Sequence, residues 1–130
     1  MIALDTNVLV RAFARDDERQ TPIAQQLIRR LTLETPGFVS LTVIVELYWV
    51  LARSLRRPIP EVLEMFDSIM ATEVFEIEDG ESVGEALEAA RRGADFPDAL
   101  IHATSRLYGI TETATFDRHA AETLGWRLLA

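Results

Sequence analysis

Cysteine and lysine are both absent from the sequence. The lack of cysteine excludes disulfide bonds, thiolate metal ligands and cysteine nucleophiles. The lack of lysine excludes Schiff-base chemistry, phosphate binding by a P-loop and receiver-type phosphotransfer, because each of these depends on a lysine side chain. All 13 basic residues are therefore arginines, whose planar guanidinium groups suit bidentate contacts with phosphate.

The sequence also has little that suggests a membrane or a secretory route. Its longest apolar run, residues 47–52, is bounded by Glu46 and Arg53 and is too short to span a bilayer. The N-terminus lacks the basic start and the small-residue cleavage site of a signal peptide, so we expect a cytoplasmic protein without membrane contact. The formal net charge of −8 argues against a protein that coats nucleic acid non-specifically.

Strand-like and helix-like patterns alternate along the 130 residues, of which 48% are hydrophobic. This length and composition fit one domain covering residues 1–130 with a substantial core. Short apolar runs predict strands at residues 2–4, 38–40, 73–78, 110–115 and 126–129. Helical periodicity predicts helices at residues 7–14, 20–33, 41–55, 60–70, 82–92, 95–108 and 117–124. We therefore predict an α/β fold, a three-layer α/β/α sandwich with a central, mainly parallel sheet.

Four aspartates lie where a helix is predicted to begin. Asp5 and Asp117 each follow a predicted strand, whereas Asp95 and Asp98 open a helix. An aspartate in such a position commonly caps the helix by accepting a backbone N–H, so each of the four has a structural role available when taken alone. A role in a binding site is the alternative, because ligands bind at the carboxyl ends of the strands in open α/β sheets.

Glu46 lies in the middle of a predicted helix, where no cap is needed. All other residues from 43 to 51 are apolar. A glutamate in such a run is normally paired or bound to a cation. Two structural roles also stay open for it: membership of an exposed stripe that Glu46 shares with Thr42 and Arg53, or a salt bridge to a buried arginine.

Taken together, these acids suggest a metal site. The predicted topology brings Asp5 and Asp117 to one edge of the sheet, and it starts the helices that carry Glu46 and Asp98 near the same edge. Carboxylates packed together repel one another unless a positive charge neutralises them, and no lysine is present to do so. A divalent cation would neutralise them, and ligands that are all oxygen favour Mg²⁺ or Mn²⁺ over zinc.

Four segments, which together extend over nearly the whole chain, carry a family resemblance. They are Leu4-Asp5-Thr6-Asn7-Val8-Leu9, Val45-Glu46-Leu47-Tyr48-Trp49-Val50-Leu51, Asp95-Phe96-Pro97-Asp98-Ala99-Leu100-Ile101-His102-Ala103 and Thr115-Phe116-Asp117-Arg118. In order and spacing they resemble PIN-domain proteins, and most of all the VapC toxins of bacterial type II toxin–antitoxin pairs. Pro97 departs from the family pattern, in which a small residue such as alanine is common at that position.

The resemblance implies a Mg²⁺-dependent endoribonuclease, with Mn²⁺ able to substitute, that acts on RNA, is inhibited by a cognate antitoxin and forms a homodimer. Four acids match the metal-binding and catalytic quartet: Asp5, Glu46, Asp98 and Asp117. Asp95 matches a frequent accessory acid. Three polar residues match positions that support the metal site: Thr6, Asn7 and Thr115.

Two arginines and two histidines lie close to these acids in the sequence. Arg11 and Arg118 are candidates for contacts with RNA phosphates. His102 and His119 are candidates for proton transfer, because histidine titrates near neutral pH. The sequence favours a purely structural role for both histidines, because His102 lies one turn after Asp98 on a predicted helix and His119 follows Asp117 on a surface-like helix.

Three other functions fit parts of the sequence. One is a non-catalytic acidic module that binds a protein partner through its apolar helices. Another is a phosphatase or receiver-like protein with Asp5 as nucleophile, which the missing lysine and the lack of a second aspartate two residues later disfavour. The last is a PIN-like nuclease that cuts DNA.

Overall fold

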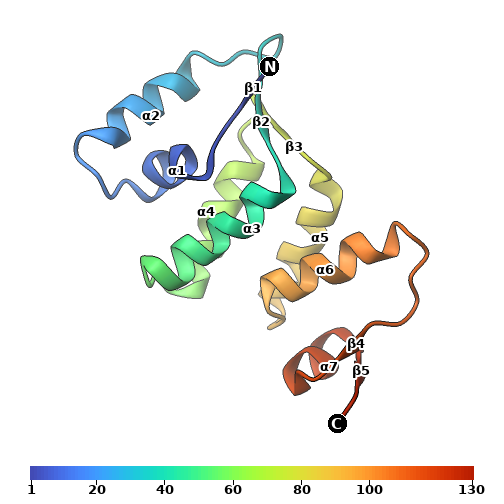
Figure 1. Cartoon of the computed structure of the whole chain (residues 1–130). Coiled ribbons are helices and arrows are strands. Elements are labelled where there is room, and N and C mark those ends of the chain that lie inside the picture. The colour runs from blue at the N-terminus through green and yellow to red at the C-terminus, as the bar shows by residue number, and fades with distance from the viewer. The chain divides into compact units, whose positions relative to one another are not determined.

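The computed structural model describes all 130 residues, which form two compact units covering residues 1–80 and 81–130. Figure 1 shows the helices and strands of both units. That residues 1–130 make up a single domain stays a prediction.

A parallel sheet of three short strands organises the first unit (Figure 1). Its strands are β1 (Ile2–Ala3), β2 (Gly37–Val39) and β3 (Phe75–Ile77), in the order β1-β2-β3. Gly37 packs closely, because a Cβ atom there would lie 2.8 Å from Cδ1 of Leu4 and 2.9 Å from Cδ1 of Leu31, so both leucines would have to move. In the parallel register Ile2 lies opposite Gly37 and Ala3 opposite Phe38, and Asp5 follows the carboxyl end of β1.

The connections between these strands are helical, because neighbouring parallel strands need a long crossover, which is usually an α-helix. After β1 come α1 (Thr6–Leu9), the π-helical η1 (Val10–Ala14) and α2 (Gln20–Arg29); after β2 come α3 (Leu41–Trp49), the π-helical η2 (Val50–Ser54) and α4 (Ile59–Met70). Ser40 caps α3 by accepting the N–H of Val43 at 3.2 Å. This capped start fixes where the helix of Glu46 begins.

The core of the first unit gathers apolar side chains from both helical connections and from β2. The following side chains are at most 1% exposed: Leu9, Val10, Val39, Ile44, Leu47, Leu51, Val62, Phe66 and Ile69. Burial of this kind contributes roughly 1.5–3 kcal/mol for each large side chain. The core therefore holds α1 and α3, which carry the first acids, on one rigid body.

The second unit consists of three helices and a two-stranded parallel sheet (Figure 1). The helices are α5 (Gly80–Arg91), which begins at the last residue of the first unit, α6 (Phe96–Arg106) and α7 (Arg118–Leu124). The strands β4 (Ala114–Thr115) and β5 (Arg127–Leu128) pair with Ala114 opposite Arg127. Gly93, Gly109 and Gly125 adopt positive φ angles after the three helices, as C-terminal stops do.

The α/β fold with parallel strands predicted from the sequence is confirmed. The strands are shorter than predicted, and β4 and β5 hydrogen-bond only to each other, whereas one continuous sheet was expected. The predicted helix over 20–33 ends at Arg29, because backbone bonds at Arg30 and Leu31 tighten into a turn. None of the helices combines the length and the apolar composition that crossing a bilayer requires.

Candidate metal centre

Asp5 stands at the carboxyl end of β1 and at the start of α1. Its backbone is extended, and its carbonyl oxygen accepts the N–H of Val8 at 3.0 Å, as an N-cap residue does. Its side chain, however, makes no capping hydrogen bond and is exposed. A capping role for this carboxylate is therefore wrong, and the group is available to a ligand.

Glu46 is held by a residue of the strand–helix junction that also carries Asp5. The hydroxyl of Thr6 donates a hydrogen bond to Oε1 of Glu46. Thr6 is only 3% exposed, so this hydroxyl depends on Glu46 as its partner. The contact fixes one oxygen of the glutamate and joins α1 to α3 beside Asp5.

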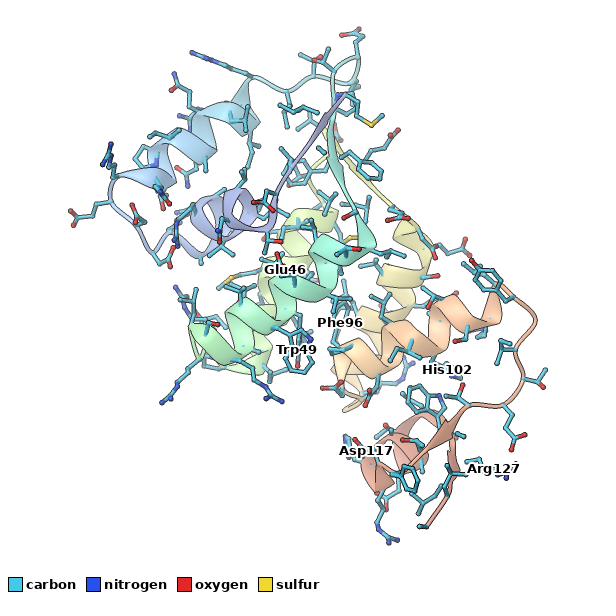
Figure 2. All side chains as sticks on the ribbon, in the orientation of Figure 1. Glu46, Trp49, Phe96, His102, Asp117 and Arg127 are labelled. Atoms are coloured by element: carbon cyan, nitrogen blue, oxygen red, sulfur yellow. The ribbon has the colours of Figure 1, made fainter.

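The environment of Glu46 decides between the structural roles that the sequence leaves open. Glu46 is exposed on α3, where Figure 2 labels it together with Trp49. It forms no salt bridge; Arg53 lies instead over the ring of Trp49, 4.7 Å from its centroid. The prediction that Glu46 belongs to an exposed stripe of the helix is therefore confirmed, and the prediction of a salt bridge to a buried arginine is wrong. An exposed carboxylate that lacks a cationic partner remains free to bind a cation.

In the second unit, two aspartates cap the helices that they precede. Asp95 accepts the N–H of Asp98 through Oδ2 at 3.1 Å, at the start of α6. Asp117 accepts the N–H groups of His119 at 2.9 Å and Ala120 at 3.2 Å, both through Oδ1, at the start of α7. The capping role is therefore right for these two residues. Each cap uses one oxygen of its carboxylate and leaves the other as an acceptor.

Two further hydrogen bonds fix the loop around Asp117. The hydroxyl of Thr115 accepts the backbone N–H of Asp117 at 2.9 Å. The ring Nε2 of His119 lies 2.8 Å from the carbonyl oxygen of Gly93, two residues before Asp95. These bonds tie the start of α7 to the segment that leads into α6.

The electrostatic environment of Asp98 disfavours its charged form. Partial burial in the first turn of α6, followed by the negative charges of Asp95 and Asp117, raises the pKa of Asp98 above its ordinary value. The nearby His119 opposes this rise. The three aspartates therefore lie close enough to destabilise the charged form of Asp98, which is the condition that a cation would relieve.

No arginine neutralises these acids, since none of the salt bridges in the structure involves them. Of the two predicted phosphate contacts, Arg11 is engaged, with Asp16 at 3.0 Å and Gln20 at 2.7 Å. Arg118, next to Asp117, is exposed and forms no salt bridge. Within each unit, no three histidine, aspartate or glutamate side chains are positioned as a ready-made metal site.

Sequence reasoning did not find the partner of His102. The indole Nε1–H of Trp126 donates to Nδ1 of His102 at 3.0 Å, which favours the structural role for this histidine. The two residues are 24 positions apart, and no periodicity links them. Asn7, predicted to support the metal, is exposed and lines a groove beside Arg11.

Residues 2–124 match the family model described as the PIN domain. The chain belongs to the PIN domain family. PIN domains are generally metal-dependent nucleases, so the chain is a nuclease module by family. A search among curated proteins found no match.

The donors present fit a hard divalent cation. The five acids offer oxygen atoms only: Asp5 and Glu46 in the first unit, and Asp95, Asp98 and Asp117 in the second. Such a set favours Mg²⁺ or Mn²⁺, because zinc sites normally include nitrogen or sulfur ligands. The raised pKa of Asp98 fits the same ion, because a neighbouring positive charge would favour its ionised form.

Proposed function

We propose that this PIN-family chain is a Mg²⁺-dependent endoribonuclease, with Mn²⁺ able to replace Mg²⁺. Four acids would hold the metal: Asp5, Glu46, Asp98 and Asp117. Asp95 is the accessory acid beside them. The observation that carries the proposal is the group of aspartates around Asp98: burial, and then the charges of Asp95 and Asp117, raise the pKa of Asp98, and no arginine neutralises the group.

The chain's own residues position these carboxylates. Thr6 holds one oxygen of Glu46, and Thr115 fixes the backbone of Asp117. Asp95 holds the first turn of α6 and so the position of Asp98. When bound, a divalent cation supplies the Lewis acidity that makes a water nucleophilic and stabilises the leaving oxygen of a phosphodiester.

Arg118 is the residue that we assign to the RNA backbone. It is exposed, follows Asp117 directly and has no acidic partner, so its guanidinium can bind a phosphate in bidentate geometry. Arg11 differs, because its guanidinium already binds Asp16 and Gln20. A contact with phosphate by Arg11 would require these bonds to break, so we do not assign it that role.

The nuclease proposal is tested by incubating the purified chain with single-stranded RNA and Mg²⁺, beside the Asp5→Asn variant. We expect cleavage by the wild type, loss of cleavage on chelation by EDTA, and no cleavage by Asp5→Asn. Glu64→Gln is the matched control, since Glu64 is an exposed helical acid outside the group. Equal cleavage by the wild type and Asp5→Asn would refute the proposal, and preferential cleavage of an equivalent DNA would favour the DNA nuclease instead.

We also propose that the nuclease is a toxin neutralised by a cognate antitoxin protein and that it forms a homodimer. A groove of about 320 Å³ between α1, η1 and α2 supports the antitoxin. Its lining includes Val8, Leu27 and Ile23, and the side chain of Ile23 is 63% exposed. An apolar segment of the antitoxin would cover this exposed surface.

The toxin proposal is tested by inducing the chain in bacterial cells. We expect growth arrest that disappears with Asp5→Asn and on co-expression of a small protein encoded beside the gene. Normal growth with a soluble and RNA-cleaving wild type would contradict the toxin role while leaving the nuclease intact. Sedimentation of the purified chain tests the homodimer, and a monomer at micromolar concentration would refute it.

A further inference from the structure

A hydrogen bond between two side chains joins α6 to the residue that precedes β5. The indole Nε1–H of Trp126 donates to Nδ1 of His102 at 3.0 Å, and the ring centroids are 6.3 Å apart. Figure 2 shows His102 on α6. Trp126 is only 9% exposed, so its N–H has little access to water as an alternative partner. An indole N–H can only donate, so Nδ1 must be the unprotonated nitrogen of His102.

This bond lies on a short path between two of the proposed metal ligands. His102 follows Asp98 by one turn of α6. Trp126 leads into β5, and directly after β5 the N–H of Leu129 donates to the carbonyl oxygen of Thr115 at 2.9 Å. The hydroxyl of Thr115 in turn accepts the N–H of Asp117. The bond between His102 and Trp126 therefore connects the helix of Asp98 to the strand pair that ends at Asp117.

We propose that His102 is a positioning residue, whose acceptor nitrogen anchors Trp126 and thereby sets Asp98 and Asp117 at the spacing that metal binding needs. The proposal rests on the proposed function, because it takes these two aspartates as metal ligands. It assigns no contact between His102 and the substrate or the metal. It gives a specific role to a histidine for which the sequence offers only proton transfer or an unspecified structural part.

His102 lies beside several charged side chains of the second unit. His102 lines a cavity of about 670 Å³ among α5, α6 and α7. The charged side chains that line it are Glu85, Glu88, Arg92, Arg106 and Glu122. Arg106 lies 3.2 Å from Glu85 and Arg92 lies 3.9 Å from Glu88, whereas Glu122 has no salt bridge. If Nδ1 carried a proton, its N–H would face the indole N–H of Trp126 with no acceptor between them. The hydrogen bond therefore forms only when Nδ1 is unprotonated.

The bond is tested first in the whole, unmodified chain by NMR of the two tryptophan indole groups. Trp126→Phe identifies the Trp126 resonance by its loss. We expect the indole proton of Trp126 at a hydrogen-bonded position in the wild type, and a move to a free position in His102→Leu. A wild-type Trp126 resonance at a free position would overturn the proposal.

Positioning is tested by Mn²⁺ affinity. His102→Leu removes the acceptor, and we expect it to weaken Mn²⁺ binding about five-fold, the value of one hydrogen bond. His102→Asn places Oδ1 near the position of Nδ1, so it should retain the affinity of the wild type. Should His102→Leu fail to fold, Trp126→Phe removes the donor while keeping an aromatic ring, and it carries the same expected loss.

The outcomes separate this inference from the proposed function. If Asp98→Asn and the wild type bind Mn²⁺ equally, the metal site itself is wrong. If Asp98→Asn loses Mn²⁺ but His102→Leu, Trp126→Phe and His102→Asn all bind like the wild type, the proposed function stands and His102 has no positioning role. Loss with His102→Leu and recovery with His102→Asn would support the inference.

Discussion

The acids of the first unit and those of the second are organised by different forces. In the first unit, the buried hydroxyl of Thr6 holds Glu46 across 40 positions of sequence, and the Asp5 side chain makes no cap. In the second, Asp95 and Asp117 are fixed by the helix starts that they cap, and the charged form of Asp98 is destabilised by burial and then by their charges. The acids of the first unit depend on a tertiary contact, whereas those of the second depend on local helix starts, on burial and on neighbouring negative charge.

The comparison teaches that a capping role and a ligand role are compatible in one aspartate. Asp117 caps α7 through Oδ1 alone, and Thr115 fixes its backbone. Such a cap fixes the orientation of the carboxylate through one oxygen and leaves the second oxygen available to a metal. In the first unit, the orientation of Glu46 depends on the single hydroxyl of Thr6. One substitution at Thr6 would therefore remove this support.

The largest expected effect is loss of cleavage on removing one carboxylate charge from either unit. Asp5→Asn and Asp98→Asn should each lower the rate of RNA cleavage by at least about 100-fold, because each removes a proposed ligand of the catalytic metal. The measurement is the initial rate at saturating Mg²⁺. An effect confined to one unit would mean that only that unit holds the metal.

The next effect compares Thr6, which holds the side chain of Glu46, with Thr115, which fixes the backbone of Asp117. Thr6→Val keeps the buried shape and removes the hydroxyl that holds Glu46, and we expect about a 10-fold loss of activity, as for other residues that orient metal ligands. Thr6→Ser, which restores a hydroxyl, is the control and should recover most of the rate. Thr115→Val should cost less, because the cap at α7 still fixes Asp117. A larger loss of activity with Thr115→Val than with Thr6→Val would contradict this difference between the two units.

A stability measurement addresses the repulsion around Asp98. Because the pKa of Asp98 is raised in the folded state, the folded chain binds this proton more tightly than the unfolded chain does. The resulting stability is present at low pH and is lost as pH rises from the ordinary value through the raised one. At neutral pH without metal, Asp98→Asn should therefore unfold at a temperature a few degrees above the wild type.

Magnesium should reverse this order by raising the melting temperature of the wild type more than that of Asp98→Asn, since ligand binding stabilises the folded state. Thermal unfolding followed by circular dichroism, in EDTA and in Mg²⁺, makes both comparisons. Identical melting curves for the two proteins in EDTA would contradict the raised pKa of Asp98.

The smallest effect concerns the two arginines. Arg118→Ala should raise the KM for RNA roughly five-fold and leave kcat nearly unchanged, since it removes a phosphate contact and no metal ligand. Arg11→Ala should leave KM unchanged, because Arg11 is already paired with Asp16. Steady-state kinetics on one RNA substrate distinguish the two. A larger effect of Arg11→Ala would restore it as the substrate contact.

The parts of the fold that follow from local chemistry were predictable from the sequence. The helix stops at Gly93 and Gly125 appear as positive φ angles, and the parallel α/β pattern is present. The capping of Asp95 and Asp117 was also an open expectation that the structure settles. These features depend on neighbours within a few residues, which is why sequence patterns contain them.

The remaining features depend on contacts between distant residues. Nothing in the pattern around Thr6 shows that its hydroxyl reaches Glu46, and nothing around Trp126 shows that it donates to His102. The strands β4 and β5 have two residues each, too few for an alternating pattern to set their pairing. For the acids, the sequence supplied the residue types, and the structure shows which of them are capped and which are held by other side chains.

The central proposal is that Asp5, Glu46, Asp98 and Asp117 are ligands of a divalent cation. The most direct test is calorimetric titration of Mn²⁺ into the full-length wild type, Asp5→Asn, Asp98→Asn and the control Glu64→Gln. We predict that each aspartate variant loses at least about 10-fold in Mn²⁺ affinity, while Glu64→Gln binds like the wild type. Wild-type affinity in either Asp5→Asn or Asp98→Asn would contradict the assignment of that aspartate as a metal ligand.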